Sequence, residues 1–351
     1  MLNRRTVLLG CGAMAGAMRV KGSKRPFCID CQSHMFAPQL IAMMQKRKKP
    51  PYIYDKGNQR FLVVGEWHRP MLAMPLHVDV DLKLKTMDEA GIDMTALSIN
   101  DPGPELFGSQ GAEVAQICND FIAGVVKRHP TRFLGLAVLP LQDMNASMAE
   151  LDRCIGKLGM KGILLYSNID GKFPDEPQFR DMFRRAEQLN VPILLHPPNP
   201  VTYAVTSGYK LTGGLGLMFD TTIAVARIIL SGLMDEHPKL KLVCPHVGGT
   251  LPYLIGRIDH QMFVLKRAAG ELKINRRPSE YLKNVYLDCV SALPQAIRFA
   301  YDMVGPDRFL YSSDHPWVDP KFIRSNLDSL NLPARDQEKV LSGTAKKLFG
   351  I

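Results

Sequence analysis

The amino-acid sequence predicts a (β/α)8 barrel, the TIM-barrel architecture of the α/β class. Eight short β-rich runs alternate with longer segments of helical periodicity from Phe27 to the C-terminus. Several of these runs are almost continuously apolar, as expected of parallel strands that are buried on both faces. An open doubly wound sheet would usually carry a glycine-rich phosphate loop after its first strand, and the sequence has none there. The closed barrel is therefore the favoured fold.

The expected strands can be placed one by one. In chain order they are "FCID" (27–30), "TALSIN" (95–100), "FLGLAVLP" (133–140), "KGILLYS" (161–167), "VPILLH" (191–196), "KLVCPH" (241–246), "VYLDCV" (285–290) and "FLYSSD" (309–314). Helical periodicity fills the segments between them, and two of the expected helices end at His-Pro, where proline stops a helix. The connections 35–78 and 197–216 are unusually long and are expected to form lids or substrate walls.

The composition is that of a soluble globular protein rather than a disordered chain. Of the 351 residues, 46% are hydrophobic and 22% are charged, which leaves ample material for a core. Because barrels of this type often exceed about 250 residues, residues 27–351 are expected to form one domain. The net charge of +10 comes from scattered basic residues without a nucleic-acid-binding motif. The expected partner is therefore a small molecule and not nucleic acid.

The N-terminus predicts export from the cytoplasm. The stretch "MLNRRTVLLGCGAMAGAM" combines Arg4 and Arg5 with a short, weakly apolar run and with small residues suited to cleavage. Residues 1–22 therefore resemble a twin-arginine signal peptide, and a periplasmic or secreted protein is expected. The alternative is a cytoplasmic protein with an unprocessed basic tail. No membrane span is expected here, because a span needs about 20 apolar residues.

Polar side chains suited to metal binding stand at the ends of several expected strands. Gln32 and His34 follow the first strand, His196 closes the fifth, His246 closes the sixth and Asp314 closes the eighth. In a (β/α)8 barrel, the carboxyl ends of all strands converge on one mouth, where the chemistry takes place. The pattern therefore predicts a single site at that mouth.

Strand periodicity predicts which residues near the first strand face this site. With a period of two, Asp30, Gln32 and His34 share one face, whereas Cys31 and Ser33 share the other. Cys31 is therefore not expected to replace a metal ligand, and Gln32 and His34 form the expected pair.

Several stretches together resemble the amidohydrolase superfamily, and within it the branch related to aminocarboxymuconate semialdehyde decarboxylase. They are "IDCQSH", "MDEAGIDMTALS", "RFLGLAVLPLQD", "LLHPP", "DTTIAVARIILSGLMDEHPKLKLVCPHVGGTLPYLIGRID" and "SSDHPW". The resemblance implies that His34, His196 and Asp314 bind a divalent metal, expected to be zinc with manganese as the alternative. His246 is then the catalytic base, and Asp314 is a second candidate for moving the proton.

Gln32 departs from the pattern of this family. The resemblance places it at the first metal ligand, where relatives carry histidine or glutamate. A glutamine carbonyl is a neutral and weaker ligand, so a lower metal affinity or a different preferred metal is expected. Whether Gln32 still coordinates the metal stays open.

The resemblance also suggests residues that contact the substrate. Arg257 matches an arginine that reaches the active site of a neighbouring subunit, which implies a homodimer. Lys210 stands where relatives have an aromatic wall residue, and Trp317 is either a stacking surface for a flat substrate or part of the core. Gly65, in "FLVVGE", replaces an arginine of the related decarboxylase, so a different substrate is expected.

The favoured function is metal-dependent decarboxylation of a small carboxylated, aromatic compound. The first alternative is metal-dependent hydrolysis of a lactone, ester or amide by the same residues. The second is a ligand-binding barrel without catalysis, in which Gln32 marks a lost metal site.

Overall fold

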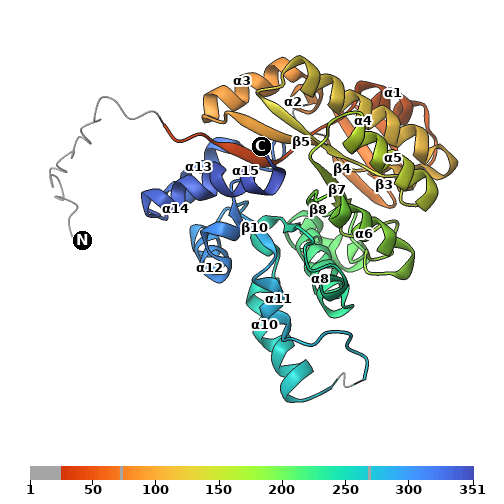
Figure 1. Ribbon diagram of the computed structural model, residues 1–351. Helices are drawn as coiled ribbons and strands as arrows, with labels where there is room; N and C mark the ends of the chain where they lie inside the picture. Colours follow the sequence, from red (N-terminus) through yellow and green to blue (C-terminus); the bar gives the residue numbers. More distant parts are fainter. Residues whose placement is uncertain (1–24, 72–73, 268–269) are drawn as a thin grey trace, which may run out of the picture.

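The expected barrel is confirmed by a computed structural model that describes residues 25–71, 74–267 and 270–351 (Figure 1). Eight parallel strands follow the order β1-β5-β6-β7-β8-β9-β10-β11. Their bounds are Ile29–Met35, Met94–Ile99, Phe133–Ala137, Gly162–Tyr166, Ile193–His196, Leu242–Cys244, Tyr286–Asp288 and Phe309–Leu310. All eight strands expected from the sequence are present, although most are shorter than expected. The expected export signal, residues 1–22, lies outside the described residues.

Backbone hydrogen bonds between the first and last strands close the barrel. The amide of Cys31 donates to the carbonyl of Tyr311 (3.0 Å), and the amide of His34 donates to the carbonyl of His315 (2.8 Å). A parallel bridge between Ser33 and His315 continues this contact beyond β11. The closure brings the end of β1 beside the loop that follows β11, and this junction carries half of the site described below.

Helices surround the barrel, as Figure 1 shows. They are α1 Pro38–Lys46, α2 Met74–Val78, α3 Val80–Ala90, α4 Gly111–Arg128, α5 Met144–Gly156, α6 Arg180–Gln188, α7 Tyr203–Thr206, α8 Leu217–Leu230, α9 Leu233–Glu236, α10 Leu251–Asp259, α11 Pro278–Leu282, α12 Pro294–Val304, α13 Pro320–Asp328, α14 Ala334–Glu338 and α15 Thr344–Phe349. Aspartate caps begin some of them: Asp79 accepts from the amide of Leu82 (3.0 Å) at α3, and Asp143 accepts from that of Ala146 (3.0 Å) at α5.

Segment 212–230, which contains α8, is long and apolar enough to cross a membrane by composition alone. Within the barrel its apolar residues have another role, because Val225, Ile228 and Ile229 are fully buried in the main hydrophobic core. We therefore describe α8 as a core helix.

The first long connection folds into a small antiparallel sheet. Its strands are β2 (Tyr52–Lys56), β3 (Gln59–Val64) and β4 (Trp67–Pro70), and each pairs with its neighbour in the chain. The second long connection contains α7 and two short helical turns, Gly208–Lys210 and Thr212–Gly216. Tyr203 of α7 links the two connections, because its hydroxyl donates to the carbonyl of Glu66 (3.0 Å).

Strand β1 differs from the expectation in two ways. It extends to Met35, so Gln32 and His34 lie within the strand instead of after it. Its pairing with β5 also shifts between Asp30 and Ser33, where three steps along β1 match two along β5. Such a bulge adds one residue and resets the alternation of side chains.

The predicted separation of Cys31 from the ligand pair is therefore wrong. Cys31, Gln32 and His34 line the same internal cavity of about 10 Å³, in the company of Leu164 and Leu194 inside the barrel. Burial raises the pKa of the Cys31 thiol well above its usual value, so the side chain stays protonated. Cys31 is a small apolar residue beneath the site and not one of its ligands.

Candidate metal centre and active-site cavity

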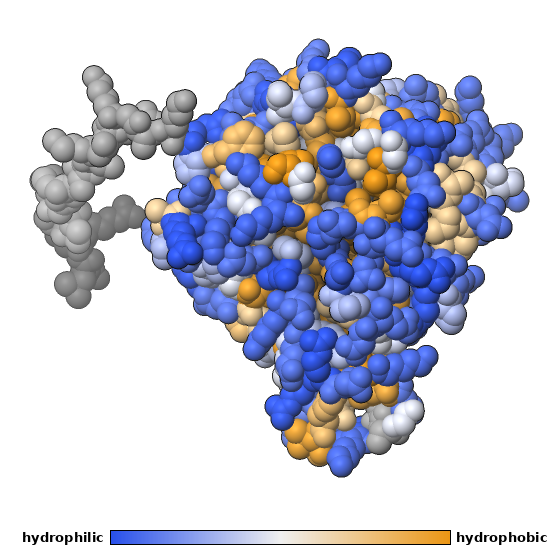
Figure 2. All heavy atoms as spheres, in the orientation of Figure 1, coloured by the Kyte–Doolittle hydropathy of each residue, from blue (hydrophilic) through white to orange (hydrophobic). Residues whose placement is uncertain are grey.

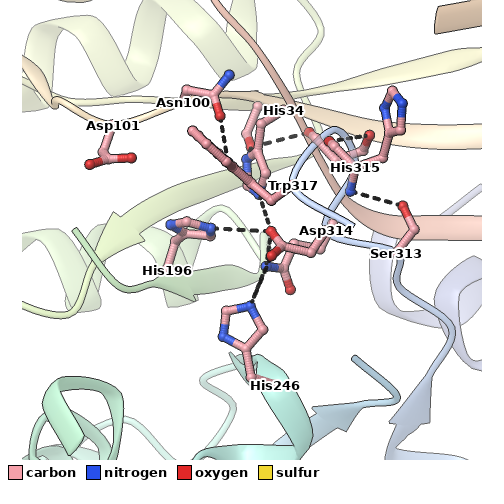
Figure 3. Close-up of polar contacts among 12 residues, drawn as sticks. His34, Asn100, Asp101, His196, His246, Ser313, Asp314, His315 and Trp317 are labelled. Atoms are coloured by element: carbon pink, nitrogen blue, oxygen red, sulfur yellow. Dashed lines mark hydrogen bonds and ion pairs between the residues drawn. The ribbon is translucent and has the colours of Figure 1, made fainter. Parts of the chain in front are cut away.

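Three side chains from three parts of the barrel meet at its mouth. His34 comes from β1, His196 is the last residue of β8, and Asp314 lies in the loop after β11. Figure 3 shows both imidazoles and that of His246 arranged around the Asp314 carboxylate. The candidate ligand atoms of His34, His196 and Asp314 all lie within 4.8 Å of one another, and all three residues are buried.

The distances in this cluster suit a bound divalent metal. Nε2 of His34 lies 3.2 Å from Oδ1 of Asp314, and Nε2 of His196 lies 3.6 Å from the same oxygen. Two ligands of one tetrahedral metal, each at about 2.1 Å, stand about 3.4 Å apart. Nε2 of His196 is buried and has no hydrogen-bond partner, so an atom available for coordination points into the cluster.

The tautomer of His34 supports the same conclusion. Its Nδ1 hydrogen-bonds Oγ of Ser98 (2.7 Å), and the Ser98 hydroxyl donates to the carbonyl of Ser33 (3.4 Å). Nδ1 therefore carries the proton, and the lone pair of Nε2 faces Asp314. Burial and the nearby His196 lower the pKa of His34 to about 4, so this imidazole is neutral. A cation between Nε2 and Oδ1 of Asp314, which lie 3.2 Å apart, would accept both lone pairs.

Asp314 is the anionic centre of the cluster. Burial opposes its ionisation, but the surrounding imidazoles of His196, His246 and His34 hold the pKa of its carboxyl well below the usual value. Asp314 also has a left-handed backbone, with φ of 60°. Backbone strain of this kind is concentrated at functional sites, where the surrounding structure imposes it.

Gln32 contacts this cluster through its amide nitrogen. Nε2 donates to Oδ1 of Asp314 (3.1 Å) and lies 3.2 Å from Nε2 of His246. Oε1 is buried without a hydrogen-bond partner. A half-turn of the amide would exchange these atoms and direct Oε1 at the cluster, where a metal would satisfy it. Gln32 thus lies beside the cluster, where a fourth ligand would be expected. Its amide nitrogen, which cannot coordinate a metal, faces the cluster in place of the oxygen.

We expect Gln32→Glu to bind Mn²⁺ at least about 10-fold more tightly than the wild type, because the variant adds a second anionic oxygen donor to the cluster. Competition with a fluorescent chelator would measure this affinity. Gln142→Glu is the control, because Gln142 is an exposed glutamine whose amide donates to the carbonyl of Gly108. An unchanged affinity in Gln32→Glu would remove position 32 from the metal site.

His246 follows β9 in a strained turn. His246 and Val247 have φ of 55° and 54°, and Gly248 and Gly249 continue in the left-handed region. A Cβ at position 249 would lie 2.9 Å from the carbonyl oxygen of Met218, so only glycine fits there. Asp288 holds the turn by accepting from the amide of Val247 (3.3 Å). The turn places Nε2 of His246 3.5 Å from Oδ2 of Asp314.

A large cavity opens above these residues. Its volume is about 840 Å³, and His196, His246 and Asp314 form part of its lining. Most of the remaining wall is apolar and includes Leu217 and Phe322. The size and the few convergent polar groups are typical of a site for a small organic ligand.

Two residues proposed from the sequence as substrate contacts do not reach the cavity of this chain. Lys210 is exposed on the short turn Gly208–Lys210, and the neighbouring Gly213 and Gly214 line the cavity instead. Lys210 is therefore not a cavity residue here, because its turn carries the side chain into solvent. Arg257 is exposed on α10, and its expected role in a neighbouring subunit stays a prediction, as does the homodimer.

Trp317 lies in the cavity wall, so its assignment to a substrate surface agrees with the geometry. Its indole Nε1 donates to Oδ1 of Asn100 (2.8 Å), which Figure 3 shows, and its ring meets His77 edge to face at 4.7 Å. Trp67, Arg69 and His77 also line the cavity, and all three belong to the connection 35–78 that was expected to form a lid or substrate wall. Their signal in the sequence was weak, because an inserted hairpin has no fixed place in the barrel pattern.

A buried lysine, Lys83, joins strand β1 to the loop after β11, the two segments that carry His34 and Asp314. Nζ of Lys83 in α3 hydrogen-bonds Oγ of Ser33 (2.7 Å) and Nδ1 of His315 (2.7 Å). Ser33 and His315 directly adjoin His34 and Asp314 in the sequence. Burial lowers the pKa of Lys83 to about 7. Lys83 therefore fixes the spacing of two metal ligands without contacting either one.

Glu105 is another buried acid outside the metal cluster. Glu105 sits over Gly103 beside Tyr166, and a Cβ at position 103 would lie 2.3 Å from Oε2 of the glutamate. Burial, with smaller contributions from Asp170 and Asp101, raises the pKa of Glu105 to about 8. Because the folded state keeps this proton between about pH 4.5 and pH 8 and the unfolded state loses it, stability falls as pH rises through that range.

Glu105→Gln is therefore expected to be more stable than the wild type by about 4 kcal/mol at pH 8 and nearly equal at pH 4. Urea unfolding at both pH values, with chelator present throughout, would measure the difference. Glu113→Gln, at an exposed position of α4, is the control and should show no such pH dependence. Equal differences at pH 4 and pH 8 would show that Glu105 is ionised in the folded protein.

The fold and the cluster define a class of protein: a (β/α)8 barrel with a divalent-metal site formed by His34, His196 and Asp314 at the mouth of an apolar cavity. Within this class, the chain belongs to the amidohydrolase family, whose model matches residues 29–351. The expected resemblance is thereby confirmed, and the protein is a metal-dependent enzyme.

Individual relatives agree with this assignment. The chain is 32% identical over 325 residues to gamma-resorcylate decarboxylase of Rhizobium sp., covering 89% of this chain and 98% of that protein. It is 30% identical over 281 residues to 2-amino-3-carboxymuconate-6-semialdehyde decarboxylase of Dictyostelium discoideum, covering 78% and 77% of the two chains. A dihydroxybenzoic acid decarboxylase from Polaromonas sp., solved with manganese and the inhibitor 2-nitroresorcinol, superposes with a TM-score of 0.79. That similarity covers 93% of this chain and 97% of the other at 25% identity.

Proposed function

We propose that the protein is a metal-dependent decarboxylase of small hydroxylated aromatic acids. The observation that carries the proposal is the position of the His34–His196–Asp314 cluster at an apolar cavity whose lining also contains a candidate proton carrier, His246. The similarity to decarboxylases over most of the chain favours this reaction over hydrolysis. The flat indole of Trp317 in the wall suits an aromatic ring.

The reaction needs a proton more than it needs a nucleophile. A proton must reach the ring carbon that bears the carboxylate; the carbon–carbon bond then breaks, its electron pair restores the aromatic ring, and carbon dioxide leaves. When bound, the divalent metal supplies positive charge that holds and polarises the substrate oxygens beside that carbon. The residues of the chain must hold the ring, exclude water and deliver the proton.

His246 is the residue best placed to deliver this proton. It lines the cavity, and its Nε2 lies 3.5 Å from Oδ2 of Asp314, whose negative charge stabilises the protonated imidazole. Asp314 is the second candidate, since it also lines the cavity. The apolar wall formed by Leu217, Val290 and Phe322 keeps bulk water away from the ring.

The donor set of two histidine nitrogens and one carboxylate oxygen suits a divalent ion that prefers nitrogen and oxygen ligands. Two imidazoles and one carboxylate suit zinc, which was expected from the sequence. The same donors suit manganese, which is bound in the Polaromonas relative. We therefore propose that both metals be tested in the assay.

The test is a product analysis with protein loaded with Mn²⁺ or Zn²⁺. The substrates are 2,6-dihydroxybenzoate, 2-hydroxybenzoate and 4-hydroxyisophthalate, each labelled with carbon-13 in one carboxylate. We expect labelled carbon dioxide and a product whose mass is lower than that of the substrate by one molecule of carbon dioxide. A product of a lactone or ester substrate that has gained water would favour the hydrolase instead, and no turnover of any aromatic acid would contradict the proposal.

A further inference from the structure

The described wall of the cavity contains one cationic side chain besides the histidines. Among the described residues that line the cavity, Arg69 is the single arginine or lysine and Asp314 the single carboxylate. Asp314 belongs to the metal cluster. An anionic group of a ligand that lies away from the metal therefore has Arg69 as its one available cationic partner in this chain.

Arg69 is held between the only two tryptophans of the chain. Its guanidinium carbon lies 5.0 Å from the ring centroid of Trp67 and 4.6 Å from that of Trp317. Trp67 and Arg69 lie two residues apart on β4, so they share one face of the small sheet, whereas Trp317 comes from the loop after β11. Two stacked rings fix the plane of the guanidinium.

Asp101 fixes the rotation of the guanidinium within that plane. Nη2 of Arg69 donates to Oδ1 of Asp101 (2.8 Å), two residues after β5, which leaves Nη1 without a hydrogen bond to the described residues. The Arg69 side chain is 13% exposed. The guanidinium is thus rigid and mostly desolvated, yet only part of its donor capacity is used. Such a group binds a carboxylate without first losing side-chain freedom.

We propose that Arg69, flanked by Trp67 and Trp317, forms a subsite for a second acidic group on the aromatic substrate, with a carboxylate as the defining case. The inference rests on the proposed function, because it adds to the acidic group at the metal a second acidic group at Arg69 in the same cavity. The favoured substrates are aromatic dicarboxylates and the disfavoured ones are the matching monocarboxylates. Asp101 is a positioning residue in this subsite.

The test compares binding of two ligands that differ by one carboxylate. Isophthalate and benzoate are titrated into Mn²⁺-loaded protein, and the fluorescence of Trp67 and Trp317 reports binding without any need for turnover. We expect isophthalate to bind about 30-fold more tightly than benzoate to the wild type, and this ratio to fall to about 3-fold in Arg69→Gln. Glutamine keeps a donor for Asp101, so the variant is expected to fold.

Arg47→Gln is the matched control, because Arg47 lies in the same long connection and stacks on Phe107 at 4.7 Å, but does not line the cavity. Its ligand ratio should equal that of the wild type. Arg69→Lys should give an intermediate ratio, because it keeps the charge and loses the planar fork.

An equal ratio in the wild type and Arg69→Gln would overturn the subsite even if the protein releases carbon dioxide from hydroxybenzoates. Conversely, a ratio that depends on Arg69 without any decarboxylation would support the subsite and contradict the proposed function. The same loss in Arg47→Gln would also overturn the subsite, because it would reveal a general effect of the connection.

Discussion

His246→Asn is expected to lower kcat for carbon dioxide release by about 1,000-fold while the metal content stays unchanged. The asparagine occupies a similar volume but cannot carry a proton between pH 5 and 9. The substitution removes the imidazole nitrogen that lies 3.5 Å from Oδ2 of Asp314, but it leaves the His34–His196–Asp314 cluster complete. The prediction is checked by steady-state kinetics together with elemental analysis of the same preparation.

His260→Asn serves as the control, because His260 is exposed at the end of α10 and lies outside the cavity lining. If His246→Asn kept a near-normal kcat, His246 would not be the proton carrier, and Asp314 would be the remaining candidate. Loss of metal along with activity would instead make His246 part of the metal site.

Asp314→Asn is expected to reduce both metal affinity and activity. Asp314 is the one carboxylate of the metal cluster, and its oxygens lie near His34 (3.2 Å), His196 (3.6 Å) and His246 (3.5 Å). Its loss should weaken Mn²⁺ binding by more than the roughly 10- to 100-fold that follows removal of an outer-shell partner. Activity at limiting metal should fall to background. Isothermal titration with Mn²⁺ and an activity assay at several metal concentrations would test both expectations.

The matched variant is Asp302→Asn, which removes an exposed carboxylate paired with Arg298 on α12. It should change neither quantity. If Asp314→Asn regained full activity at saturating metal, the carboxylate would serve only to bind the ion and would have no part in the proton transfer.

The barrel could be predicted from the sequence because parallel strands buried on both faces leave a simple trace. Runs such as Ile193–His196 are apolar until the final residue, and that residue is the one that faces the mouth. His196 was therefore placed correctly at a strand end, whereas His246 and Asp314, which were expected to close their strands, lie in the loops that follow β9 and β11. The exact strand ends were less predictable, since the last hydrogen bonds of each strand depend on its neighbours.

The bulge in β1 could not be predicted, because an inserted residue depends on pairing with another strand. A strict period of two put Cys31 opposite Gln32, whereas the shift between Asp30 and Ser33 places both inside the barrel. The connections 35–78 and 197–216 were expected to form lids or substrate walls, and residues of both line the cavity, but the positions of their individual side chains could not be predicted. Trp67 and Arg69 reach the mouth through a local hairpin whose position relative to the barrel is set by contacts with Trp317 and Asp101.

The small sheet β2–β3–β4 separates two tasks that many enzymes place on the same strands. The metal ligands belong to the barrel, whose strands tolerate little change, while Trp67 and Arg69 belong to a hairpin that pairs only with itself. Replacement of that hairpin can therefore alter the accepted compound and leave the reaction intact. Randomised libraries confined to residues 52–70 are therefore a natural route to new substrates.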